Sequence, residues 1–132
     1  MTDASYGITR SLGKVSFEDA LDRVTAALSK EGFGVLTEID VKATLKKKLD
    51  VDFRKYRILG ACNPPLAHGA LNTELMIGLL LPCNVVVLEE DDGTVTASAV
   101  DPAEMFRVVD NATLESTAQE VEAKLVRAIE LT

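Results

Sequence analysis

Tryptophan is absent from this chain of 132 residues, aromatic residues make up only 5% of it, and it contains one histidine. The core must therefore be filled by Leu, Val, Ile and Ala side chains. No apolar run approaches the roughly 18 residues that suggest a membrane span, and the first residues contain no apolar signal segment. We expect a protein that is neither membrane-embedded nor exported, and we place it in the cytoplasm.

Basic residues are scarce, with 14 Lys and Arg against 21 Asp and Glu, and the net charge is −7. Affinity for nucleic acid depends mainly on neutralising phosphates with Lys and Arg, so this balance argues against a nucleic-acid partner. Half of the basic residues nevertheless lie between Lys42 and Arg57. We interpret this stretch as a solvated helix face, with a binding surface for an anionic ligand as the alternative.

The chain has only two cysteines, Cys62 and Cys83, which are most simply reduced thiols in a cytosolic protein. The two thiols and His68 do not have the spacing of a zinc site, and His68 falls on the outer side of its predicted helix. His68 also lacks a clear nucleophile or carboxylate partner for a catalytic triad. If a metal binds at all, we expect a soft ion on Cys62 and Cys83.

The length suits one domain spanning residues 1–132. Hydrophobic periodicity and capping residues predict helices over 17–30, from Asp40 to about 49, 64 to about 72, and from about 111 to the end. Strands are predicted over 4–12, 33–39, 53–61 and 94–100. We expect 33–39 to pair near the opening strand.

Two apolar runs, 76–81 and 85–88, lie between the third predicted helix and an acidic stretch at residues 89–93. We interpret them as one long strand with a bulge or edge at Pro82, because proline cannot donate to a strand ladder. Asp92 and Gly93 then mark a hairpin turn. A hairpin with alternating polar faces predicts an α+β fold, with a largely antiparallel, curved sheet of about five strands covered by helices.

A repeated Cys-Asn pair is the strongest chemical signal: Cys62-Asn63 ends one predicted strand, and Cys83-Asn84 lies within the next. Cys62 comes directly before a predicted helix, whose dipole and free amides would stabilise a thiolate. If the two strands are neighbours, both thiols come close together. The alternative, which is the more common role of buried cysteines, is that both are small core residues.

Three stretches together resemble the domain of unknown function 302 family: residues 32–49, 56–64 and 77–84. The likeness continues through Asp101-Pro102 to Met105 and covers about residues 5–130. The resemblance implies a compact α+β domain with a topology similar to the TATA-binding-protein class, and a homodimer. It implies no established activity and no known cofactor.

We therefore predict a homodimeric binding module without catalysis of its own. Its cleft would take a small anionic or thiol-reactive ligand, or a soft metal ion, and would be bordered by the Lys-rich helix. The residues assigned to it are Cys62, Asn63, Cys83, Asn84, Lys46 and Lys47. One alternative is a redox or transferase enzyme that uses Cys62. The other is a structural or regulatory dimer with no small-molecule site.

Overall fold

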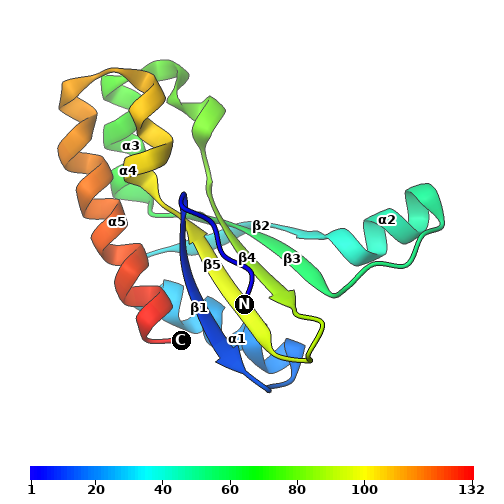
Figure 1. Ribbon diagram of the computed structural model, residues 1–132. Coiled ribbons are helices and arrows are strands. Elements are labelled where there is room, and N and C mark those ends of the chain that lie inside the picture. The colour runs from blue at the N-terminus through cyan, green and yellow to red at the C-terminus, as the bar shows by residue number, and fades with distance from the viewer.

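The computed structural model describes all 132 residues and shows an α+β fold with one five-stranded sheet (Figure 1). The strands lie in the order β1-β5-β4-β3-β2, and every neighbouring pair is antiparallel. The elements are β1 (Gly7–Gly13), α1 (Phe17–Lys30), β2 (Gly34–Asp40), α2 (Val41–Leu49), β3 (Tyr56–Cys62), α3 (Pro64–Thr73), β4 (Cys83–Glu89), β5 (Val95–Val100), α4 (Pro102–Met105) and α5 (Glu115–Glu130). None of these helices is long and apolar enough to cross a membrane.

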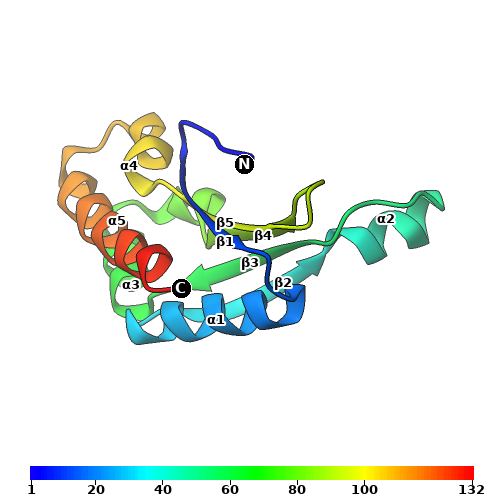
Figure 2. The same cartoon turned by 60° about the horizontal axis from the view of Figure 1, so that its bottom comes forward.

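The main core lies between one face of the sheet and helices α1 and α5. Figure 2 shows α1 running across that face, with α5 beside it. The strands contribute mostly small aliphatic side chains, and the largest fully buried ones include Leu28 of α1, Leu59 of β3 and Leu125 of α5. Phe17 and Phe33 are the only aromatic residues of this core, which is otherwise almost entirely aliphatic.

Helix starts follow the capping residues in the sequence. Ser16, Asp40 and Asn63 each accept a hydrogen bond from the backbone N–H three residues ahead, and so begin α1, α2 and α3. A side-chain acceptor satisfies an amide that the first turn leaves unpaired. The predicted helix over 17–30 is therefore confirmed. The last helix begins later than expected, at Glu115, because residues 112–114 form a 3₁₀ turn capped by Asn111.

The predicted position of the second strand is wrong. Strand β2 does not pair near β1 but lies at the opposite edge of the sheet, beside β3. Helix α1 runs beneath the sheet and returns the chain at the far side, and β1 pairs instead with β5. Periodicity identifies a strand, but it carries no information about which strand becomes its neighbour.

The predicted long strand over 76–88 is also wrong. Residues Leu75–Leu80 form a 3₁₀ helix, a cis peptide joins Leu81 to Pro82, and β4 begins only at Cys83. Ile77 is buried in a second, smaller core cluster with Ala70, Phe106, Leu114 and Ala118. The first apolar run packs against α3 and α5 and so cannot continue the sheet.

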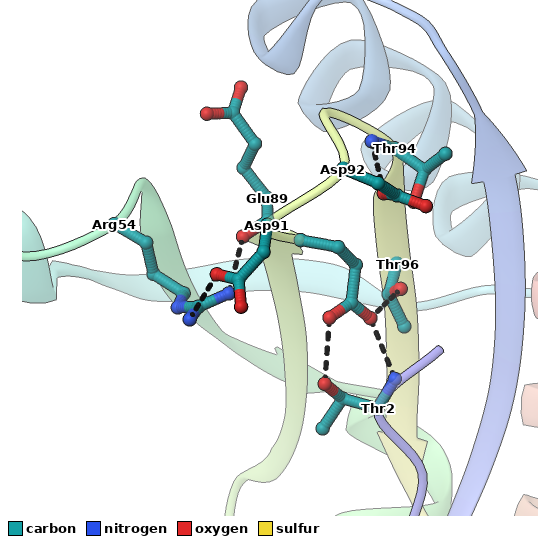
Figure 3. Close-up of polar contacts among 8 residues, drawn as sticks. Thr2, Arg54, Glu89, Asp91, Asp92, Thr94 and Thr96 are labelled. Carbon is teal, nitrogen blue, oxygen red and sulfur yellow. Dashed lines mark hydrogen bonds and ion pairs between the residues drawn. The ribbon is translucent and has the colours of Figure 1, made fainter.

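The acidic turn joins β4 to β5 as predicted and is fixed by hydrogen bonds (Figure 3). The Glu90 carboxylate accepts from the Thr2 backbone N–H, the Thr2 hydroxyl and the Thr96 hydroxyl, at 2.6 to 2.7 Å. These hydrogen bonds, above all the one from Thr96, hold the pKa of Glu90 below its ordinary value. Arg54 donates to the Glu89 carbonyl and to Asp91, which ties the turn to the segment before β3.

Strands β2 and β3 extend beyond the helices and carry α2 away from the rest of the molecule (Figure 1). No residue of α2 is buried, so this basic helix is solvated, as the first interpretation of its sequence expects. At its root, Arg57 of β3 forms ion pairs with Glu38 and Asp40 of β2. We call residues 41–55 the arm.

The sheet face opposite the main core is only partly covered. Ile39, Ile58 and Val86 pair directly in register across β2, β3 and β4, so their side chains share this face. None of the three is buried, and Ile39 is 49% exposed. We call these three residues the open-face row.

Candidate functional site

A small apolar pocket lies where β3 ends, β4 begins and α3 packs against α5. Its volume is about 30 Å³, enough for a water-sized group. The lining residues are Phe33, Ala61, Cys62, Asn63, Leu66, Ala67, Ala70, Leu81, Pro82, Cys83, Phe106, Thr117 and Val121. No acidic, basic or histidine side chain is among them. Burying an unpaired charge is costly, so the pocket suits a small uncharged group.

Both predicted thiols line this pocket. Cys83 pairs with Ala61 across β4 and β3, so Cys62 is one residue beyond the direct partner of Cys83. Cys62 is half-buried, whereas Cys83 belongs to the main core and is only 6% exposed. Both are free thiols. The sheet therefore brings the two together while leaving only Cys62 within reach of solvent.

Burial raises the pKa of the Cys83 thiol to about 11, with a smaller contribution from the nearby Cys62. An unfolded chain would ionise this thiol near its ordinary value of 9.0. Because the unfolded state loses the proton first, stability should fall between pH 9 and 11. A difference of two pKa units corresponds to about 2.7 kcal/mol.

Urea unfolding at graded pH measures this loss. The Cys83→Ala variant provides the control, because it lacks the thiol but keeps every other group that titrates in this range. Its stability should fall less steeply than that of the unchanged protein above pH 9. Parallel curves for the two proteins would contradict a buried, neutral Cys83.

The start of α3 does not offer the free amides that the sequence interpretation expects. Pro64 and Pro65 have no N–H, the Leu66 N–H donates to the Asn63 side chain, and the Ala67 N–H donates to the Asn63 carbonyl. The two prolines that make the helix start recognisable also remove its capacity to bind an anion.

The remaining predicted site residues are divided by the fold. Asn63 lines the pocket, and its side-chain amide also donates to the Glu31 carbonyl. Asn84 is exposed and lines a separate surface groove with Leu79 and Val100.

The arm does not border the cysteines. Lys46 and Lys47 lie on α2, which begins at the end of β2 farthest from Gly34, the residue that pairs with Cys62. Lys46 instead forms ion pairs with Asp50 and Asp52. The prediction that the Lys-rich helix borders the cysteine site is therefore wrong. One end of β2 lies beside Cys62, and α2 follows the other end.

Several lining residues are not signalled by the sequence. Three of them, Phe33, Leu81 and Phe106, lie in separate parts of the chain. Their local sequence indicates a helix end, a strand and a helical turn, respectively, and not a pocket. Only the packing of α3 and α5 against the end of the sheet brings them together. Burial of Phe33 was weakly indicated by the sequence, because an apolar residue commonly packs back on the helix after a left-handed glycine such as Gly32.

Few side chains of this protein are arranged so that they could bind a metal ion. Nowhere do three or more His, Cys, Asp or Glu side chains gather in a way that could hold a metal ion. His68 lies on the exposed side of α3 and contacts Asn72 through its Nε2 atom at 3.3 Å. A soft ion would have only the two cysteine sulfurs.

The family model described as "Domain of unknown function DUF302" matches residues 8–132 of the chain. The chain belongs to this family. It is also similar to the crystal structure of an uncharacterised conserved DUF302 protein from Bacillus stearothermophilus, at 30% sequence identity and a TM-score of 0.88. The match covers 96% of this chain and 98% of the other. No curated protein matches.

Membership of the DUF302 family accounts for the fold and its extent along the chain. It supplies no reaction, ligand or partner, because neither description contains one. The likeness to the TATA-binding-protein topology stays a prediction. Any function for this DUF302 domain must therefore be argued from its own residues.

Proposed function

We propose that this domain binds a small uncharged ligand in the apolar pocket, with the Cys62 thiol as its contact group. The observation that carries the proposal is that two sulfurs from neighbouring strands line one cavity, one of them half-buried and one sealed in the core. Apolar walls with a few polar atoms are typical of ligand sites. Two free thiols also suit the reducing cytoplasm, where we place the protein.

Binding is favoured over turnover by what surrounds the thiol. A cysteine nucleophile normally needs an adjacent base or a cationic neighbour, and none of the lining side chains is His, Lys or Arg. The raised pKa of Cys83 keeps that second thiol protonated near neutral pH. A ligand with an anionic group would also have to leave its charge unpaired against these walls.

Xenon is a suitable probe, because small dry cavities lined by apolar side chains take up this gas. We expect saturable shifts at the amides of Ala61, Ala67 and Ala70 when ¹⁵N-labelled protein is exposed to xenon under pressure. The Ala67→Leu variant should lose them, because its longer side chain fills the pocket. Gly69→Ala, on the exposed side of the same helix, should retain them. Shifts that do not saturate would contradict the site.

The role of Cys62 is tested with methyl methanethiosulfonate. The Cys62 thiolate would attack the sulfenyl sulfur, form a methyl disulfide and release methanesulfinate. This adduct should block the xenon shifts in the unchanged protein. Cys62→Ser should still take up xenon before and after the reagent. Blocking in the serine variant, or none in the unchanged protein, would exclude Cys62 from the pocket.

We propose in addition that the domain forms a homodimer. The observation in favour is the open-face row, in which Ile39 is exposed and Ile58 and Val86 are only half-buried by the chain itself. Contiguous exposed apolar surface commonly marks a protein interface. Sedimentation velocity over a range of concentrations gives the mass directly, and a monomer throughout would exclude this proposal without touching the pocket.

A further inference from the structure

The arm is held to the rest of its chain mainly at its base, where Arg54 contacts Glu89 and Asp91, and no residue of α2 is buried. In both ribbon views α2 stands away from the sheet and the other helices (Figures 1 and 2). Leu49 is 65% exposed, and Val51 and Phe53, which follow it, are 43% and 40% exposed. Large apolar side chains therefore gather on a segment that buries almost nothing.

Helix α2 is too short to be stable by itself. It has nine residues, and isolated helices of fewer than about 12 to 15 residues are marginal in water. Val41, Leu45 and Leu49 follow one another at steps of four and so share one side of the helix. A partner that stabilises α2 would therefore have to pack against this apolar side of the helix.

Charge divides the chain into two unequal parts. Seven of the 14 basic residues and only two of the 21 acidic residues lie between Lys42 and Arg57. This stretch therefore has a formal charge of +5 and the rest of the chain −12, which together give the overall −7. The stretch that contains most of the arm and the rest of the chain therefore carry net charges of opposite sign.

An apolar surface continues from the arm onto the sheet. Ile39 lies directly before Asp40, the residue that caps α2, and it is the edge member of the open-face row. Tyr56 shares that face, two residues before Ile58, and its ring lies 6.2 Å from that of Phe53. Apolar side chains that are exposed or half-buried thus continue from the arm onto the open face.

We infer that the arm packs on the open sheet face of a second copy of this chain, in a symmetric exchange. The inference rests on the homodimer proposed above and names the surface that forms it. A two-fold interface uses the same patch twice, and here one chain supplies both the apolar row and the apolar, basic arm that complement each other. Acidic residues outside the arm attract its lysines and orient the encounter.

The test compares two pairs of charge reversals that alter net charge equally. Lys47→Glu with Lys48→Glu changes the arm, and Lys14→Glu with Lys30→Glu changes exposed lysines elsewhere. All four side chains are exposed, so both variants should fold. We expect the dimer dissociation constant, from sedimentation velocity, to rise at least tenfold for the arm pair and less than threefold for the control pair. Equal effects would overturn the inference.

A second measurement locates the contact. Equal amounts of ¹⁴N- and ¹⁵N-labelled protein are mixed and treated with a carbodiimide, which joins lysines to carboxylates without a spacer. Mixed-isotope products should join Lys47 or Lys48 of one copy to carboxylates of the other. A dimer without such products overturns the arm contact and leaves the homodimer intact, whereas a monomer at every concentration overturns both.

Discussion

Replacing Gly60 by alanine should lower the free energy of unfolding by about 2 to 3 kcal/mol, the upper range for overpacking a well-filled interior. Gly60 lies in the middle of β3, where Thr37 of β2 and Pro82 pack over it. An added Cβ would lie 2.8 Å from Pro82 Cγ and closer still to Thr37 Oγ1. The Pro82 ring and the edge strand must both move to admit one methyl group. Urea unfolding measures the loss.

Gly69 supplies the matched control for this prediction. It lies within α3, and a Cβ added there would meet no atom within 4 Å. Gly69→Ala should therefore stabilise the protein by about 0.5 to 1 kcal/mol, because alanine is the better helix former. The same glycine-to-alanine change should therefore lower the free energy of unfolding at position 60 and raise it at position 69. Similar effects at both positions would show that Thr37 and Pro82 do not press on β3.

Phe106→Ala should destabilise the protein by about 3 to 4 kcal/mol, in line with truncation of buried aromatic residues. Phe106 is 8% exposed, lines the apolar pocket and belongs to the small core cluster with Ala70 and Ile77. Its removal leaves a cavity that α3 and α5 can only partly close. Val108→Ala is the control: this side chain is 77% exposed, so its loss should cost less than about 0.5 kcal/mol.

The same variant also tests the pocket. Loss of the Phe106 ring should enlarge the cavity enough to admit benzene, which raises stability by binding only the folded state. Benzene should therefore recover part of the lost stability in Phe106→Ala and have no effect on Val108→Ala. A variant that loses stability but gains nothing from benzene would show that the neighbouring helices collapse into the space.

Local signals explain which elements could be predicted. Ser16, Asp40 and Asn63 are recognisable as helix caps because each side chain acts on a backbone amide only three residues away. The same holds for the turn at Gly93, whose backbone φ of +85° favours glycine. The family resemblance was confirmed, and so was the α+β class.

Predictions were wrong where the structure of a segment depends on packing against residues far away in the sequence. The apolar run at Leu75–Leu80 reads as a strand, yet burial of Ile77 against Phe106 makes it a 3₁₀ helix. The side of the sheet on which β2 lies depends on the path of α1, which no residue of β2 encodes. Closeness in sequence predicts that the lysines of α2 lie near the cysteines, but the length of β2 separates them.

The candidate site was predictable only in part. Cys62, Asn63 and Cys83 line one pocket because the pairing of Ala61 with Cys83 makes β3 and β4 neighbours. The difference between the two thiols was not predictable, since burial of Cys83 depends on helices from both halves of the chain. The free amides expected at the start of α3 are missing because Pro64 and Pro65 have no N–H, which is already evident from the sequence.

Both edge strands of the sheet are irregular: the pairing register shifts between Ser11 and Gly13 in β1, and between Val35 and Thr37 in β2. A kinked edge is a poor template for a strand from another molecule. The sheet is therefore guarded against growing sideways into a longer, shared sheet or a fibril. The homodimer proposed above uses side chains on a face of the sheet instead, where association can be specific and reversible.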